Sequence, residues 1–138
     1  MLYDRFASAL MADPWVGLKE AACLFIDPSP AVQEEFFMRH RVMDDATREQ
    51  LLRLFEMERA AQAALTSCAW FFDDFGGLEG RVALRWAARA VELAADLMPS
   101  IESEVLQQLR SVHSNRREIG DSATLYLSIK AREARGGV

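Results

Sequence analysis

The residues best suited to chemistry lie in one short stretch between two long helical patterns. Residues 66–77 read TSCAWFFDDFGG, which places two adjacent acids, Asp73 and Asp74, between aromatic residues and a pair of glycines. Hydrolysis of a glycosidic bond uses two carboxyl groups about 5 to 9.5 Å apart on opposite sides of that bond. Because adjacent side chains on a helix diverge by about 100°, we do not expect Asp73 and Asp74 to form such a catalytic pair.

A sugar-binding role suits this stretch better than catalysis does. Sugars present apolar C–H faces to aromatic rings and hydroxyl groups to carboxylates. Trp70 would then be a stacking platform, and Asp73 or Asp74 would accept hydrogen bonds from the sugar. The competing interpretation is structural: the two acids end a helix and pair with Arg85 or Arg89.

Glu58 is a carboxylate on an otherwise apolar helical stripe, which it shares with Gln62. A carboxylate in a core-facing position costs several kcal/mol unless it is paired or protonated. We therefore expect Glu58 to have a partner, to lie at the edge of the core with its head in water, or to face a polar cleft. A separate hypothesis pairs Glu58 with Asp73 in independent hydrolysis.

Three arginines at helical spacing, Arg81, Arg85 and Arg89, form a narrow charged strip together with Glu92 and Asp96. Arginine suits carboxylates and phosphates, so the strip is a candidate anion site. The two acids largely neutralise it, however. We favour a face of salt bridges within the helix, or a contact with another domain.

Other chemistry has little support. Ser67 and Cys68 have no nearby histidine and lie in no nucleophile elbow. The two cysteines and two histidines show no metal-ligand spacing, and no glycine-rich phosphate loop is present. We predict no catalytic residue, no metal site and no cofactor, and we expect Cys23 and Cys68 to be buried, reduced thiols.

The composition narrows the class of protein. The chain has 138 residues, of which 51% are hydrophobic, enough for the core of one domain. Acids outnumber bases by 21 to 16 and no basic run is long, which argues against nucleic acid as a partner. No apolar run is long enough for a membrane span, and the first residues do not resemble a secretion signal. We expect a cytoplasmic protein.

Several helices must position these residues. Apolar periodicity, capping residues and prolines predict helices at about 2–12, 14–26, 30–40, 45–72, 78–98, 101–112 and 123–131. Asp13, Ser29, Asp44 or Asp45, and Ser100 are the predicted N-caps. The first two helices have the predicted apolar stripes Leu2, Phe6, Leu10 and Trp15, Leu18, Ala22, Phe25. The longest helix has the predicted stripe Leu51, Leu54, Phe55, Ala61, Leu65, Ala69 and Phe72.

The last element is ambiguous in sequence. Leu125, Leu127 and Ile129 alternate as they would in a strand, but a lone strand has no partner elsewhere in the chain, so we predict a helix. The fold class is therefore all-α. We expect a single bundle over residues 1–138, with about six to seven helices, two of them long and central, and a disordered tail at about 134–138.

From residue 66 to residue 94 the chain resembles the helical C-terminal domain of unknown function, family 3536, that accompanies family-57 glycoside hydrolases. The long-helix motif at 54–59, the segment 27–40 and the closing loop at 114–121 extend the similarity over most of the chain. Two departures are Ala69, where the family more often has glycine, and Arg116-Arg117 in place of a usual Ile-Pro. The matching residues are Thr66, Ser67, Cys68, Ala69, Trp70, Phe71, Phe72, Asp73, Asp74 and Gly77, followed by Ala87, Ala88, Arg89, Ala90 and Val91.

The resemblance implies a supporting role in an enzyme that acts on α-glucans. In those enzymes a β/α barrel holds the glutamate nucleophile and the aspartate acid/base, and neither residue is carried over to this chain. The resemblance implies that Trp70, Asp73 and Asp74 contact the substrate and that Arg89 is a supporting partner. Glu58 is the other candidate supporting residue, because its place on the apolar stripe would let it face a polar cleft. The implied partners are a family-57-like barrel domain, in the same chain or a separate one, and an α-glucan.

The alternative of a different class is a self-contained helical scaffold. Such a protein would bind a protein partner or a second copy of itself, without carbohydrate activity. The two hypotheses differ in what they predict about Trp70, which faces a sugar cleft in the first.

Overall fold

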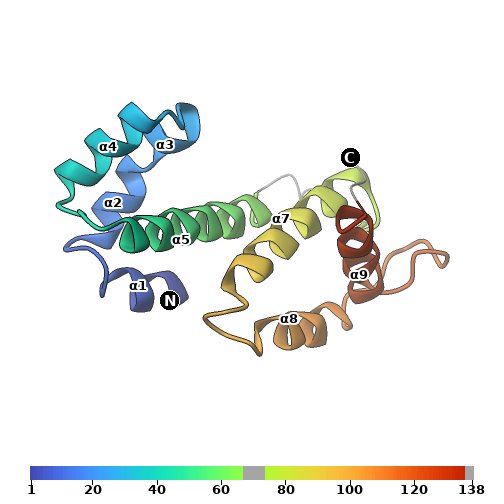
Figure 1. Ribbon diagram of the computed structural model, residues 1–138. Helices are drawn as coiled ribbons and strands as arrows, with labels where there is room; N and C mark the ends of the chain where they lie inside the picture. Colours follow the sequence, from blue (N-terminus) through green and yellow to red (C-terminus); the bar gives the residue numbers. More distant parts are fainter. Residues whose placement is uncertain (67–73, 136–138) are drawn as a thin grey trace. The chain divides into compact units, whose positions relative to one another are not determined.

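The computed structural model describes residues 1–66 and 74–135 (Figure 1). Within these ranges the regular structure is helical, and the pairing of His113 with Asp121 is an isolated β-bridge in a loop. The all-α prediction is confirmed. The helices α5 (Asp45–Ala64) and α7 (Leu78–Ala94) have 20 and 17 residues, so the two long helices of the prediction are present.

The contacts of the chain gather into two compact units where the sequence predicts one domain. The first unit is Met1–Glu56 and the second is Met57–Val138. The boundary falls inside α5, so the N-terminal part of this helix belongs to the first unit and the remainder to the second.

The first unit contains α1 (Leu2–Ala7), α2 (Pro14–Glu20), α3 (Ala22–Ile26), α4 (Pro30–Arg39) and the start of α5. Its core is aromatic: Tyr3, Phe36, Phe37 and Phe55 are almost fully buried, and Phe36 lies edge-on to Phe55 at 5.7 Å between ring centres. The predicted caps Asp13 and Asp44 are confirmed, because each carboxylate accepts a backbone N–H three residues on. Ser29 occupies the N-cap of α4 without a side-chain hydrogen bond.

The buried faces of the first helices differ from the predicted stripes by one residue. In α1 and the turn after it, Tyr3, Ala7 and Met11 are buried, whereas Leu2, Phe6 and Leu10 are half-buried. In α2 and α3 the buried face is shifted by one residue in the opposite direction: Gly17, Ala21 and Leu24 face inward, and Trp15 and Phe25 are exposed. Close packing accompanies the shift in α2: a Cβ on Gly17 would lie 2.2 Å from the Met11 methyl carbon, so a larger residue there would require the Met11 side chain to move. The first helix is also shorter than predicted and ends at Ala7.

The helix α5 begins as predicted but ends earlier. Leu51, Leu54 and Phe55 are buried, as the stripe requires. The prediction that the helix runs to about residue 72 is wrong, because α5 ends at Ala64 and the Thr66 amide donates to the Ala63 carbonyl in a tighter turn. Leu65 is consequently 68% exposed instead of lying in the core. The rest of that stripe, Ala69 and Phe72, falls outside the described residues.

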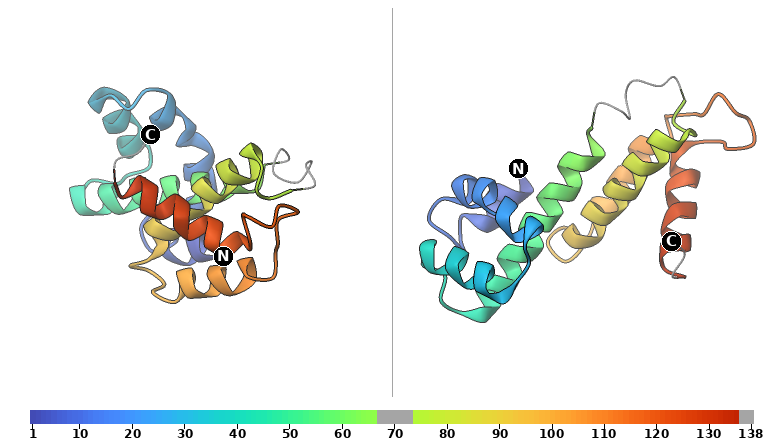
Figure 2. Two further views of the ribbon diagram at one scale, coloured as in Figure 1. Left: turned by 90° about the vertical axis from the view of Figure 1, so that its right-hand side faces the viewer. Right: turned by 90° about the horizontal axis from the view of Figure 1, so that it is seen from above.

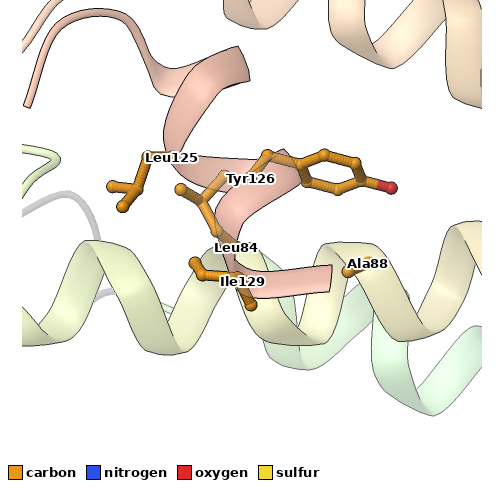
Figure 3. Close-up of a cluster of buried hydrophobic side chains, with 5 residues drawn as sticks. All are labelled: Leu84, Ala88, Leu125, Tyr126 and Ile129. Atoms are coloured by element: carbon orange, nitrogen blue, oxygen red, sulfur yellow. The ribbon is translucent and has the colours of Figure 1, made fainter. Parts of the chain in front are cut away.

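The second unit is built from α7, α8 (Ile101–Leu109) and α9 (Ser122–Glu133), with the end of α5. Within it, α8 and α9 both pack against α7 (Figure 1 and Figure 2). Figure 3 shows side chains of α7 and α9 that form the core between these two helices. This cluster consists of Leu84, Ala88, Leu125, Tyr126 and Ile129, with Phe75, Leu106, Leu109 and Ile119 against it.

The last element is a helix, as predicted. Leu125 and Ile129 are buried four residues apart, whereas Leu127 between them is 50% exposed, which is the periodicity of a helix and not of a strand. Asp121 caps α9 by accepting the Thr124 N–H at 2.7 Å. Residues 136–138 of the predicted tail lie outside the described residues, and Ala134 and Arg135 continue from α9 in a hydrogen-bonded turn.

A polar contact joins α8 to α9. Glu102 on α8 accepts hydrogen bonds from the Tyr126 hydroxyl and from the Lys130 ammonium on α9. Tyr126 has no exposed surface, and this burial, with the nearby Glu102 charge, raises the pKa of its phenol. Ser100 occupies the N-cap position of α8, as predicted, but its side chain makes no capping hydrogen bond.

Candidate functional site

The described end of the acidic stretch is a turn built around Asp74. Its Oδ1 accepts hydrogen bonds from the Ser114 hydroxyl at 2.6 Å, the Gly76 amide at 3.0 Å and the Asn115 amide at 3.3 Å. Its Oδ2 lies 3.5 Å from Nε of Arg116. One carboxylate therefore holds the start of α7 to the loop between α8 and α9, about 40 residues further along the chain.

These contacts stabilise the ionised form of Asp74. The Ser114 hydroxyl makes the largest contribution to lowering the pKa of this carboxyl group, followed by the Gly76 amide, and the Asn115 amide and the Arg116 charge act in the same direction. Asp74 is thus an anion at neutral pH whose Oδ1 is fully used by the protein. Its other oxygen, Oδ2, faces the Arg116 guanidinium at 3.5 Å.

Trp70 and Asp73, the other two predicted substrate-binding residues, lie outside the described residues. Their sugar-binding role stays a prediction. For Asp74, the expected pairing with Arg85 or Arg89 is wrong: its arginine partner is Arg116. Arg85 pairs instead with Glu133 of α9, and Arg89 with Glu92 on its own helix, each at 3.0 Å.

Glu58 has the partner that its position demanded. It is 8% exposed, and its Oε1 accepts a hydrogen bond from the Gln62 amide at 3.3 Å, one helical turn away. The next residue, Arg59, places its guanidinium 4.8 Å from the ring centre of Trp86 on α7. The contact with Gln62 accounts for the burial of Glu58 as a structural feature. Its proposed support of a sugar site stays a prediction.

The arginine strip of α7 does not act as one anion-binding ridge. Arg81 donates from Nε to the Gly76 carbonyl at 3.1 Å, while Arg85 and Arg89 are occupied by the two glutamates already named. The expected face of salt bridges is present for Arg89 and Glu92 at a spacing of three residues. Arg85 joins α7 to α9 instead.

The sequence did not predict that the closing loop, residues 114–121, contacts Asp74 in this site. Gly76 is packed so closely that a Cβ there would lie 2.4 Å from Ile119 and 2.8 Å from the Ser114 hydroxyl. Gly120 has a φ of +75°, which favours glycine and turns the loop back so that Ser114 donates its amide to the Gly120 carbonyl. The signal in the sequence was the Gly120-Asp121 pair before the last helix, which marks the turn but not the loop's contact with Asp74.

His40 pairs with Glu20 at 3.0 Å, and Cys23 is exposed, which contradicts the expected burial of this thiol; Cys68 lies outside the described residues. Within residues 1–66 and 74–135, no group of three or more His, Cys, Asp or Glu side chains is arranged to hold a metal ion. In the same ranges, no helix has both the length and the apolar character needed to cross a bilayer.

Comparison with known proteins places the chain in a family. No curated protein and no solved structure matches the chain significantly. A family model described as "Domain of unknown function (DUF3536)" matches residues 1–134. Because this match spans both compact units and nearly the whole sequence, the chain belongs to the DUF3536 family.

Proposed function

We propose that this chain is a non-catalytic helical module that completes the sugar-binding cleft of an α-glucan-processing enzyme whose catalytic barrel resembles family-57 glycoside hydrolases. The proposal starts from the resemblance of the stretch around Trp70. In it, Trp70 stacks on a sugar ring, and Asp73 and Asp74 accept hydrogen bonds from sugar hydroxyl groups. Arg89 and Glu58 support Trp70 and Asp73, whereas Asp74 is held by Arg116. The barrel supplies the two reacting carboxyl groups.

The observation that carries the proposal is the exposure of large apolar side chains on either side of this stretch. Leu65, just before it, is 68% exposed, and Leu78, just after it, is 73% exposed. Val82, one turn further along α7, is also exposed. Large apolar residues that flank a candidate site on both sides are typical of a surface that another protein covers.

The anchoring of Asp74 also supports the proposal. Three protein groups fix one of its oxygens, so the carboxylate would hold its orientation before a sugar binds. A ligand group that is already oriented loses little entropy on binding, which is the advantage of a preorganised site.

The test is titration calorimetry of the chain with maltooligosaccharides, with and without a family-57 barrel protein added in trans. We expect Trp70→Ala to weaken glucan binding by about tenfold, because a stacked aromatic ring and its buried area are lost together. Ile26→Ala is the control, because it truncates another exposed apolar residue that is more than 40 positions from Trp70 in the sequence. It should leave the affinity for the glucan unchanged. Absence of glucan binding in both settings, or equal affinity of Trp70→Ala and wild type, contradicts the proposal.

A second candidate function is supported by a different surface. In the first unit Ile26 is 84% exposed, Met43 72% and Met38 60%, and methionines adapt readily to varied apolar partners. This favours a helical scaffold that binds a protein partner or a second copy of itself. Size-exclusion chromatography with light scattering tests self-association directly: a dimer that Ile26→Glu dissociates would support it, and a strict monomer at high concentration counts against it.

A further inference from the structure

A groove in the second unit lies beside the closing loop. Its volume is about 390 Å³, within the usual range for small-ligand sites. One side is α7, another is α9, and the loop before α9 supplies the remainder. The lining residues are Arg81, Glu118, Ile119, Thr124, Leu125, Ser128 and Arg132.

Arg81 is held in position at this groove by its backbone partner. Its Nε donates to the Gly76 carbonyl at 3.1 Å, and within the described ranges neither Nη nitrogen has a carboxylate within ion-pair distance. The guanidinium is therefore oriented by one of its N–H groups and keeps the others available. That arrangement suits recognition of an oxyanion, because the planar fork of arginine matches two oxygens at once.

Arg132 is the second cation of the groove, and it lies one helical turn after Ser128 on α9. The other cations of α7 and α9 are all paired: Arg85 with Glu133, Arg89 with Glu92, and Lys130 with Glu102. In the part of the chain that the structure describes, Arg81 and Arg132 are the cations of these two helices without a carboxylate partner, and both line the same groove.

The charge of the surrounding segment also favours binding of an anion. Residues 110–135 contain six Lys or Arg and three Asp or Glu, although the whole chain has a net charge of −5. Within the groove, Glu118 is the one acid beside two arginines, and it forms no ion pair with either in the described structure. The local field therefore favours an anion despite the acidic character of the protein as a whole.

We propose that this groove binds a small hydroxylated molecule through an oxyanion, a phosphate or carboxylate group, held between Arg81 and Arg132. Glu118 would accept hydroxyl hydrogen bonds from the same ligand, and Ile119 with Leu125 would contact its apolar face. The Ser128 hydroxyl already donates to the Leu125 carbonyl at 2.7 Å, so its oxygen can act only as an acceptor. The site is separate from the glucan cleft proposed above, since a neutral sugar has no need of two guanidinium groups.

The experiment is an NMR titration of the full chain with three ligands that share one ring: glucose, glucuronate and glucose 6-phosphate. We expect amide shifts around Thr124 to Arg132 with the two charged ligands and none with glucose. Tighter binding of glucuronate would indicate a site for a carboxylate, and tighter binding of glucose 6-phosphate would indicate a site for a phosphate. Arg132→Gln should weaken their binding at least about fivefold, because it removes charge-assisted hydrogen bonds to the oxyanion.

Arg110→Gln is the matched control, since Arg110 is an exposed arginine of the same basic segment that does not line the groove. It should change the affinity by less than about twofold, as expected when screened surface charges act only at a distance. Both substitutions remove one charge at an exposed side chain, and circular dichroism checks that each variant is folded.

Three results would overturn the proposal. The first is the absence of shifts up to about 20 mM of either charged ligand, which would mean an affinity too weak for a site. The second is an equal loss of affinity in Arg132→Gln and Arg110→Gln, which would indicate a diffuse basic surface. Binding of a short oligonucleotide more tightly than either charged sugar would indicate the same. The third is unchanged affinity in Arg132→Gln. Trp70→Ala should leave this binding intact, so failure here and failure of the glucan proposal are distinguishable.

Discussion

At the scale of the residue, Asp74 is the best-defined acid of the site. Its hydrogen bonds to Ser114, Gly76 and Asn115 depend on its negative charge, and they lower the pKa of the carboxyl group. A carboxyl group whose pKa is lower in the folded state contributes stability above its ordinary pKa near 4 and loses that contribution as the pH falls through the folded value. The contact between the turn and the closing loop is therefore expected to weaken in acid.

Asp74→Asn tests this contact. The amide keeps the shape but has neither the charge nor the second acceptor oxygen, so we expect a lower melting temperature at pH 7. The difference from wild type should begin to shrink below about pH 4, where the aspartate of the unfolded chain takes up a proton. It should be lost at lower pH, as the pH falls through the lowered pKa of the folded carboxyl group. Glu104→Gln, a change at an exposed acid of α8, is the control for loss of charge. A difference that is constant from pH 7 to pH 3 would contradict the assignment.

Gly80 is a second position where one atom decides the local structure. A Cβ there would lie 2.2 Å from the carbonyl oxygen of Phe75, and this neighbour is backbone, which cannot rotate away. We expect Gly80→Ala to reduce the free energy of unfolding by about 1–3 kcal/mol, as overpacking does. Chemical denaturation measures it. Gly77→Ala, where the nearest atom is 3.3 Å away, should cost less, and the reverse order would show that the backbone adjusts.

At the scale of the element, the packing of α9 against α7 depends on the side chains of one face of α9. Leu125 and Ile129 are buried against α7, whereas Leu127 on the same helix is half exposed. Leu125→Ala should therefore cost about 2–4 kcal/mol of unfolding free energy, because it removes buried carbons and leaves a cavity. Leu127→Ala should cost less than about 1 kcal/mol. Denaturant titration of the two variants measures both values, and similar costs would mean that residues 125–129 are not packed as a helix.

At the scale of the whole molecule, the two compact units have separate cores. Tyr3, Phe36 and Phe55 lie in the first unit, and the cluster around Leu84 and Tyr126 lies in the second. Local unfolding follows such cores, since amide exchange reports the stability of each cooperative unit.

Hydrogen exchange tests this division. We expect Leu125→Ala to accelerate exchange in α7, α8 and α9 and to leave α2 to α4 unchanged. Phe36→Ala should have the reciprocal effect, with faster exchange in α2 to α4 and little change in α9. Both variants are read by mass spectrometry of the same peptides. If each substitution accelerates exchange throughout the chain, the two units unfold as one cooperative structure instead.

Local signals predicted the helices well and their faces less well. Asp13, Asp44 and the Gly120-Asp121 pair marked helix starts that the structure confirms, because capping depends on residues within one turn. The apolar character of Trp15 and Phe25 predicted that they are core residues, yet both are exposed, and Gly17 and Leu24 are buried instead. Which side of a short helix is buried depends on how closely its neighbours approach, and that distance is not encoded in the helix itself.

The sequence by itself determined an all-α protein with two long helices and an acidic, aromatic stretch between them. Periodicity, caps and helix breakers act over a few residues, so they are readable in a single chain. Only the tertiary structure decided that Asp74 binds Ser114 and Arg116, and that Arg81 and Arg132 line one groove. Those pairs are separated by 40 residues or more, and such contacts exist only after the helices between them have packed.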